Sequence, residues 1–207
     1  MILQWSNTKR LEFKTAYRLL VVVGAVLGHA ACGGGATTIP TTASVVPSPT
    51  TWRGLIIAEE NRCAPYNSND YNYSQSVEDD IIGQLGGIYS PYTGECFASK
   101  SETDIEHILA RSEAHDSGLC AADAATRSQF SNDLDNLTLA SPSMNRYQKV
   151  AKDAADWLPM NNQCWFATII IEVRRKYSLT IDQREADALE QILATCTSVA
   201  LNRSNCT

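Results

Sequence analysis

Side chains that can take part in hydrolytic chemistry gather in one stretch of this 207-residue chain. The stretch begins with Asp104-Ile105-Glu106-His107 and ends with Asn145-Arg146. A histidine with an ordinary pKa of about 6.5 accepts a proton readily at neutral pH. Carboxylate and amide oxygens are ligands for hard divalent cations, and a guanidinium group matches the geometry of phosphate oxygens. These residue types can therefore activate water, hold a cation and bind an oxyanion.

The surrounding residues predict the elements that position these groups. Apolar residues beside Glu106-His107 and at Leu137 and Leu139 indicate two short strands. Ser141 followed by Pro142 is typical of a helix N-cap and first turn. The predicted order is strand, long loop, strand and helix.

Three elements in this stretch resemble the ββα-metal motif of HNH nucleases, especially of exported bacterial HNH proteins and of the HNH domain in the CRISPR effector nuclease. The elements are Glu106-His107, Asp135-Asn136-Leu137-Thr138-Leu139 and Asn145-Arg146. The resemblance covers residues 104–157 and is looser toward the C-terminus. It implies an α+β fold with a ββα-metal core of a β-hairpin and a helix, to which further helices and disulfides are added.

The resemblance also implies a role for each matching residue. His107 would be the general base, and the Glu106 carboxylate with the Asn145 carbonyl would hold Mg²⁺, or Mn²⁺ as the alternative. Asn136 would orient the histidine loop, and Arg146 would contact the phosphate. The implied activity is that of an endonuclease acting on nucleic acid, with DNA as the expected substrate, little sequence preference and products that carry a 5′ phosphate.

Three residues near the motif complete the expected site. Lys149 and Lys152 are predicted to border the cleft with Arg146 and to make substrate binding sensitive to salt. His115 is either a contact to substrate or metal, or a structural loop residue.

The acidic metal ligand is open between two residues. Neighbouring residues on a regular strand point to opposite faces, so Glu106 and His107 share one cleft only if the strand bends or ends there. If the strand stays regular, Asp104 lies on the same face as Glu106 and competes with it as the ligand. The resemblance favours Glu106.

The N-terminal residues are typical of an export signal. A basic segment over residues 9–18 precedes the apolar run 19–27 and the small residues before Cys32. The run is shorter than the roughly 20 residues that span a bilayer. Ala30-Ala31-Cys32 also resembles a bacterial lipoprotein junction, from which His29 departs, so cleavage and lipid anchoring through Cys32 both stay open. We expect an exported protein that is extracellular, periplasmic or lipid-anchored at the bacterial cell surface.

Composition predicts three parts of the chain. Residues 1–31 are the expected export signal, residues 32–52 a flexible Gly/Thr/Ser/Pro-rich tether, and residues 53–207 the nuclease domain. Apart from Cys32 the chain has an even set of cysteines: Cys63, Cys96, Cys120, Cys164, Cys196 and Cys206. No CxxC pair occurs, so disulfides are favoured over a metal site, with the pairing undetermined.

Helical periodicity predicts the scaffold around the site. Val77–Leu85 is expected to form a helix that stops at Gly86-Gly87. Cys164–Tyr177 forms a second, and Asp182 is the expected N-cap of a third that runs to Cys196. The last two helices are predicted to pair antiparallel, with Cys164 and Cys196 joined.

Two classes of function are compatible with these features. The first is the exported, metal-dependent endonuclease, which implies a nucleic acid substrate and no obligate protein partner. The second is a catalytically inactive, surface-tethered binding or structural lipoprotein that keeps the fold. The formal net charge of −6 argues against a protein that coats nucleic acid through bulk positive charge, and it leaves a local cleft possible.

Overall fold

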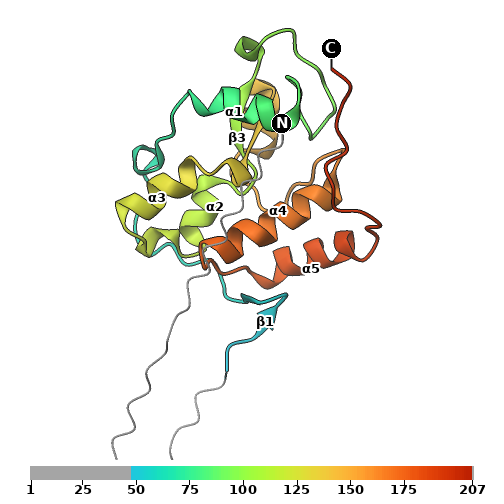
Figure 1. Cartoon of the computed structure of the whole chain (residues 1–207). Helices are drawn as coiled ribbons and strands as arrows, with labels where there is room; N and C mark the ends of the chain where they lie inside the picture. The colour runs from blue at the N-terminus through green and yellow to red at the C-terminus, as the bar shows by residue number, and fades with distance from the viewer. Residues whose placement is uncertain (1–47, 207) are drawn as a thin grey trace, which may run out of the picture. The chain divides into compact units, whose positions relative to one another are not determined.

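The computed structural model describes residues 48–206, so the expected export signal and most of the expected tether lie outside the described residues. The described part is an α+β domain (Figure 1). Its strands are β1 (Thr51–Trp52), β2 (Leu55–Ile56), β3 (Asp104–His107) and β4 (Leu137–Ala140). Its α-helices are α1 (Val77–Leu85), α2 (Arg111–Asp116), α3 (Ala124–Ser131), α4 (Gln163–Lys176) and α5 (Gln183–Leu193). Short 3-10 segments are η1 (Ser68–Tyr71), η2 (Lys100–Glu102), η3 (Leu119–Ala121) and η4 (Leu134–Asn136), and η5 (Met144–Lys149) is a π-helix.

The central element is the antiparallel hairpin of β3 and β4. Asp104 pairs with Ala140 and His107 pairs with Leu137, in a register without a bulge. The long connection between the two strands carries α2, α3, η3 and η4, where the sequence predicted only a loop. A helix begins at Pro142 as predicted, and it continues as the π-helix η5.

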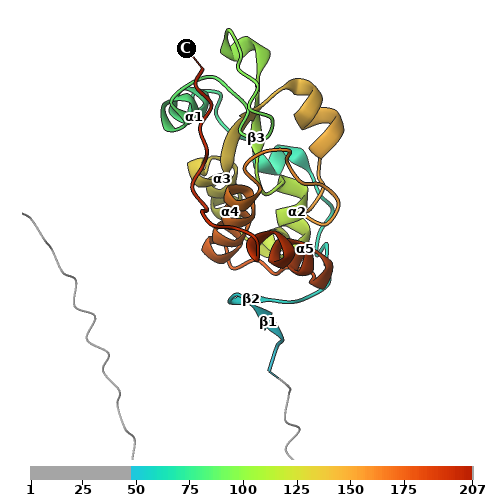
Figure 2. The same cartoon turned by 90° about the vertical axis from the view of Figure 1, so that its right-hand side faces the viewer.

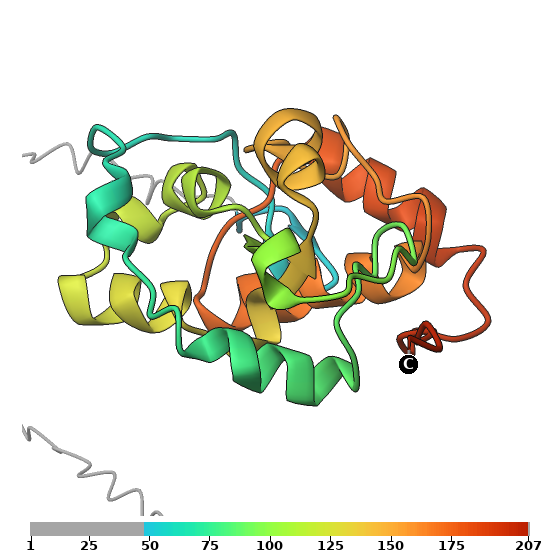
Figure 3. The ribbon, with the colours of Figure 1, turned by 90° about the horizontal axis from the view of Figure 1, so that it is seen from above.

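The hairpin lies between α1 and the segment that contains η5 (Figure 3). One apolar cluster joins Ile81 and Leu85 of α1 to Ile105, Leu137 and Leu139 of the hairpin. Gly86 ends α1 in the left-handed conformation, at φ 78°, as the predicted glycine stop requires. Because Ile105 is buried in this cluster, its neighbours Asp104 and Glu106 point to the other face of the hairpin.

The helices α4 and α5 form the larger part of the scaffold and carry a second apolar cluster with α2 and α3 residues. Asp182 caps α5, since its side chain accepts a hydrogen bond from the Glu185 amide at 2.9 Å. The disulfide Cys164–Cys196 joins α4 to the segment that directly follows α5, which confirms the predicted pairing of these cysteines. The helix α5 ends at Leu193, before Cys196.

The ends of the described domain are tied to this scaffold. The β1–β2 hairpin lies by α4 and α5 (Figure 2), where Trp52 donates to Glu190 at 2.9 Å. The residues of β1 come from the end of the segment expected to be a tether. At the other end, the disulfide Cys96–Cys206 holds the C-terminal segment. Among the described residues, no helix combines the length and apolar character that crossing a membrane requires.

Candidate active site

A cleft of about 290 Å³ opens where the end of β3, the start of α2 and the end of η5 meet. Its walls include three of the residues with candidate roles, together with two tyrosines and an arginine. These lining residues are Glu106, His107, Asn145, Tyr66, Tyr73 and Arg111. The structure thus brings the acidic residue, the histidine and the asparagine of the sequence motif to one hollow.

Glu106 and His107 can both line the cleft because the cleft lies at the end of β3. The β3 ladder is regular, so Asp104 and Glu106 lie on one face and His107 on the other. His107 is the last residue of β3, and both Glu106 and His107 line the cleft. Asp104 is half-buried beside it and stays a second candidate ligand from the same face as Glu106.

Glu106 is buried and paired with a lysine. Its Oε1 lies 2.7 Å from the Nζ of Lys149, which also donates to the His107 carbonyl oxygen at 2.9 Å. Burial raises the pKa of Glu106, and the Lys149 ammonium opposes this rise. Lys149 itself is fully buried. It therefore cannot border the cleft as a solvent-exposed cation, as the sequence predicted, because it neutralises a buried carboxylate instead.

His107 is packed on two sides by aromatic rings, with Phe130 stacked at 6.2 Å and Tyr73 edge-on at 5.2 Å between centroids. Its Nε2 lies 3.0 Å from the Ser131 carbonyl oxygen. A carbonyl oxygen only accepts, so Nε2 carries the proton and Nδ1 keeps a free lone pair. Burial, with the nearby Arg111 charge, lowers the pKa of His107 to about 3. The ring is therefore neutral at neutral pH.

Asn136 ties the start of β4 to the residues that follow His107. Its Oδ1 accepts from the Leu109 amide at 2.7 Å, and its Nδ2 donates to the Leu109 carbonyl at 3.1 Å. The side chain is fully buried. Both hydrogen bonds act on backbone, so Asn136 positions the turn after β3 and lies away from the cleft lining.

Asn145 and Arg146 both bind Asp104. The side-chain amino group of Asn145 donates to Asp104 Oδ2 at 3.0 Å. The side-chain oxygen Oδ1 of Asn145 is left available as a ligand. Arg146 donates to both Asp104 oxygens, at 2.8 and 2.6 Å. This two-pronged pairing raises the pKa of Arg146 and satisfies much of its donor capacity. Arg146 is thus engaged with Asp104, and the structure does not leave it free as the phosphate contact that the sequence predicted.

Arg111 is a cleft residue that the sequence analysis missed. Its guanidinium lies 5.3 Å from the ring centre of Tyr73, and one of its Nη atoms donates to the Tyr71 carbonyl at 3.0 Å. Its positive charge opposes the rise in pKa that burial causes at Glu106 and adds to the fall in pKa that burial causes at His107, so this charge acts on the site. The only indication in the sequence was its position four residues after His107. Because a loop was expected there, nothing singled out this arginine.

The remaining predicted residues lie outside the cleft lining. His115 is buried, and its Nδ1 and Nε2 lie 2.7 Å from the Tyr71 hydroxyl and the Ala64 carbonyl. Both ring nitrogens are occupied, which favours the structural alternative for His115 over a ligand role. Lys152 is exposed and donates to the Gln148 carbonyl at 2.8 Å.

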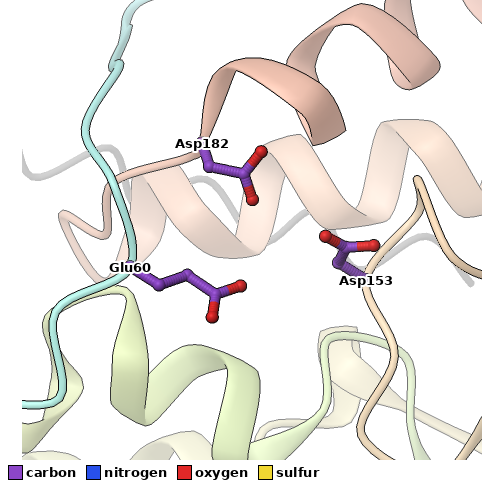
Figure 4. A group of neighbouring side chains, drawn as sticks. All are labelled: Glu60, Asp153 and Asp182. Atoms are coloured by element: carbon purple, nitrogen blue, oxygen red, sulfur yellow. The ribbon is translucent and has the colours of Figure 1, made fainter.

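A separate group of carboxylates converges between α5 and two loops: Glu60, Asp153 and Asp182, with ligand atoms within 4.8 Å of one another (Figure 4). Oxygen donors of this kind suit hard divalent cations. Two members already have structural partners, because Asp182 caps α5 and Asp153 pairs with Arg184 at 3.0 Å. The group therefore matters first for stability.

Two carboxyl groups, Glu60 of this group and the buried Glu185, make the stability of the fold depend on pH. Partial desolvation, with repulsion from Glu113 and Asp182, raises the pKa of Glu60 to about 7, and burial raises that of Glu185 to about 7. The folded chain then holds protons between pH 4.5 and 7 that the unfolded chain releases, so stability falls as pH rises through this window. We expect the melting temperature, followed by circular dichroism, to drop from pH 5 to pH 8. Glu60→Gln should reduce the drop, and an equal drop in that variant would contradict this assignment.

The part of the chain that contains the cleft matches a known protein family. The chain matches the family described as GmrSD restriction endonucleases, C-terminal domain, over residues 52–192, a range that includes every cleft residue. It is 32% identical over 123 residues to a protein of the fungus Arthroderma benhamiae that is described as an uncharacterized secreted protein. That alignment covers 58% of the chain and 60% of the relative. No solved structure matches the chain.

Proposed function

The chain belongs to the family of C-terminal domains of GmrSD restriction endonucleases, an HNH-like nuclease domain, and we propose that it is an exported, metal-dependent endonuclease. The proposed substrate is nucleic acid, with DNA expected and little sequence preference. Glu106, His107 and Asn145 form the proposed reacting centre, with Asp104 as an alternative or additional acidic ligand.

One observation carries this proposal. Glu106 and His107 from β3 and Asn145 from η5 line a single cleft, although about 40 residues separate the two elements. A catalytic base, a buried carboxylate and an amide oxygen at one hollow are the groups that hydrolysis of a phosphodiester requires. A binding protein that kept only the scaffold would have no need of this arrangement.

His107 is the proposed general base. Its pKa of about 3 keeps the ring neutral but makes it a weaker base than an ordinary histidine, so the bound ion would also have to make the attacking water more acidic. Its Nδ1 has the free lone pair, while the Ser131 carbonyl and the flanking rings fix its tautomer and orientation. In the proposed reaction Nδ1 takes a proton from water as the water oxygen bonds to phosphorus. The bond from phosphorus to the 3′ oxygen breaks, and this oxygen takes a proton from solvent, which leaves a 5′ phosphate and a 3′ hydroxyl.

The donor set fits a hard divalent ion such as Mg²⁺ or Mn²⁺. Glu106 offers Oε2, the oxygen outside its ion pair with Lys149, and Asn145 offers its side-chain oxygen from η5. Asp104 lies on the same face of β3 as Glu106, and it would bind the ion by exchanging its hydrogen bonds to Arg146 and Asn145. Hard ions take a few oxygen ligands of this kind from a protein and keep several waters. When bound, the ion would neutralise charge on the scissile phosphate and on the departing oxygen.

Arg111 is the proposed phosphate contact. It lines the cleft with His107, whereas Arg146 is engaged with Asp104 and Lys149 is buried. Arg146 and the exposed Lys152 would act at longer range, by attracting the nucleic acid backbone in a salt-sensitive manner.

The described domain has the covalent structure of a protein from an oxidising compartment. All six of its cysteines are paired: Cys63 with Cys120, Cys96 with Cys206, and Cys164 with Cys196. Such disulfides fit an extracellular protein, and the fungal relative is described as secreted. We propose export for this chain. Because that relative is fungal, the comparison lends no support to a bacterial surface, and a lipid on Cys32 stays a prediction outside the described residues.

The chemistry of the product ends tests the proposed function. We expect the oxidised protein to cleave end-labelled DNA in Mg²⁺ and to leave 5′ phosphate and 3′ hydroxyl ends. EDTA should stop the reaction, because the proposed ion would be removed from its oxygen ligands. A ligase that requires a 5′ phosphate identifies the ends. Cleavage that persists in EDTA, or that leaves 3′ phosphate ends, would contradict the mechanism.

A further inference from the structure

Part of the cleft wall comes from residues 64–76, the segment that precedes α1. Two of its tyrosines, Tyr66 and Tyr73, line the cleft together with His107 and Arg111. Tyr73 is half-buried, although its neighbours in the chain on both sides are exposed. Its ring therefore turns toward the cleft from an otherwise exposed stretch of the segment.

The backbone on both sides of this ring is fixed by one side chain. Asn132 Oδ1 accepts from the Ser74 amide at 2.9 Å, and Asn132 Nδ2 donates to the Asn72 carbonyl at 3.2 Å. Asn132 is the C-cap residue of α3 and directly follows Ser131, whose carbonyl accepts the hydrogen bond from His107. The end of α3 thus holds both the imidazole and the segment that carries the tyrosine ring.

The ring of Tyr73 contacts both groups that have proposed roles at the phosphate. His107 meets it edge-on, with the ring centres 5.2 Å apart and the planes at 66°. The Arg111 guanidinium lies over the same ring, 5.3 Å from its centre, where the face of an aromatic ring attracts a cation. His107 ends β3 and Arg111 begins α2, so the turn between them is a second connection. The ring of Tyr73 is a contact that the proposed base and the proposed phosphate contact share.

Hydrolysis needs these two groups in a fixed relative placement. His107 must reach the attacking water while Arg111 holds an oxygen of the same phosphate, and a misplacement of about 1 Å can cost roughly 10²-fold in rate. We propose that Tyr73 is a positioning residue, whose ring sets the placement of the His107 imidazole relative to the Arg111 guanidinium. Both contacts are made by the ring, so the hydroxyl is dispensable. This inference rests on the proposed function and adds to it a residue that acts through its neighbours.

Rates on two substrates test the inference. Tyr73→Phe keeps the ring and Tyr73→Leu removes it, while Tyr147→Leu is the matched control, since Tyr147 is 79% exposed and absent from the cleft lining. The kcat is measured in Mn²⁺, per folded protein as judged by circular dichroism, on a DNA oligonucleotide and on bis(p-nitrophenyl) phosphate. We expect Tyr73→Leu to lower kcat by about tenfold or more on both substrates, and the other two variants to stay within about twofold. The ester has no bases, so a loss on both substrates identifies an effect on the chemistry.

A second variant tests the same placement without changing the ring. Asn132→Ala removes the hydrogen bonds that fix the segment on both sides of Tyr73. We expect it to lower kcat on both substrates in the same direction as Tyr73→Leu.

The orientation of the imidazole gives a readout that is independent of cleavage. In EDTA and without substrate, nuclear Overhauser cross-peaks between the rings of His107 and Phe130 report their stacked packing, whose centres lie 6.2 Å apart. These cross-peaks should persist in Tyr73→Phe and weaken in Tyr73→Leu. If the unchanged protein hydrolyses neither substrate, the proposed function fails, and the cross-peaks alone decide the positioning role.

Four results would overturn the inference. They are a kcat of Tyr73→Leu within about twofold of normal on both substrates, an equal loss in Tyr73→Phe, and unchanged cross-peaks in Tyr73→Leu. The fourth is a loss confined to DNA, because it would mean that Tyr73 contacts the substrate instead of positioning its neighbours.

Discussion

Replacing His107 with asparagine is expected to lower the rate of DNA cleavage by about 10²–10⁴-fold, the range that a general base contributes. The asparagine side chain is polar but too short to reach the position of Nε2, so the variant loses both the imidazole and its hydrogen bond to the Ser131 carbonyl. It also offers no basic nitrogen lone pair to take the proton from the attacking water. The measurement is the initial rate on one oligonucleotide, per folded protein as judged by circular dichroism.

A second buried histidine supplies the control for this change. His115 has both ring nitrogens in hydrogen bonds, so His115→Asn should lower stability and leave the rate per folded molecule within a few-fold of normal. A His107→Asn rate within about a factor of two of normal would remove His107 as the base. Equal losses in the two variants would indicate general damage to the fold.

Replacing Arg174 with methionine is expected to destabilise the domain by about 3–5 kcal/mol, the typical cost of removing one partner from a buried ion pair. Arg174 is fully buried, and its guanidinium donates to Glu113 at 2.7 Å and to Glu185. It also donates to the Ser117 hydroxyl at 2.7 Å. Without it two buried carboxylates share a low-dielectric site with no counter-charge. Urea unfolding with intact disulfides measures the loss.

The pH dependence and a neighbouring residue make this test specific. Burial already raises the pKa of Glu185 to about 7, so protonation at pH 5 should relieve part of the loss, which should be larger at pH 8. Arg175 is exposed and contacts the Arg53 carbonyl, so Arg175→Met should cost at most about 1 kcal/mol. A loss below about 1 kcal/mol for Arg174→Met would mean that the buried network does little for stability.

The helices of the scaffold could be predicted from the sequence, because their bounds depend on residues that are close together in the chain. Four-residue spacing of apolar side chains and a glycine stop predicted α1, and the Asp182 cap predicted the start of α5. The pairing of Cys164 with Cys196 followed from placing both on adjacent antiparallel helices. The other two disulfides depend on how loops fold in space, and the sequence left them open.

The charged interior could not be predicted, because its partners are distant in the chain. Lys149 reads as a surface cation, since lysine is seldom fully buried, and its partner Glu106 lies 43 residues away. Arg174 reads as a cation at a helix C-terminus, yet it faces inward toward Glu113 on α2. Both assignments need the tertiary structure that brings these charges together.

The cleft was predictable in part. The motif placed Glu106, His107 and Asn145 together, and all three line it. Arg111 was missed because α2 was expected to be loop, and the π-helix η5 was missed because a short segment does not distinguish a π-helix from an α-helix.

Conversion of supercoiled plasmid to the nicked form by the oxidised protein tests the central claim most directly. The assay compares the unchanged protein and His107→Asn, each in Mg²⁺ and in EDTA. The proposed mechanism predicts nicking by the unchanged protein in Mg²⁺, and none in EDTA or by the variant. No nicking by a folded protein in Mg²⁺ or Mn²⁺, or equal nicking by His107→Asn, would contradict it.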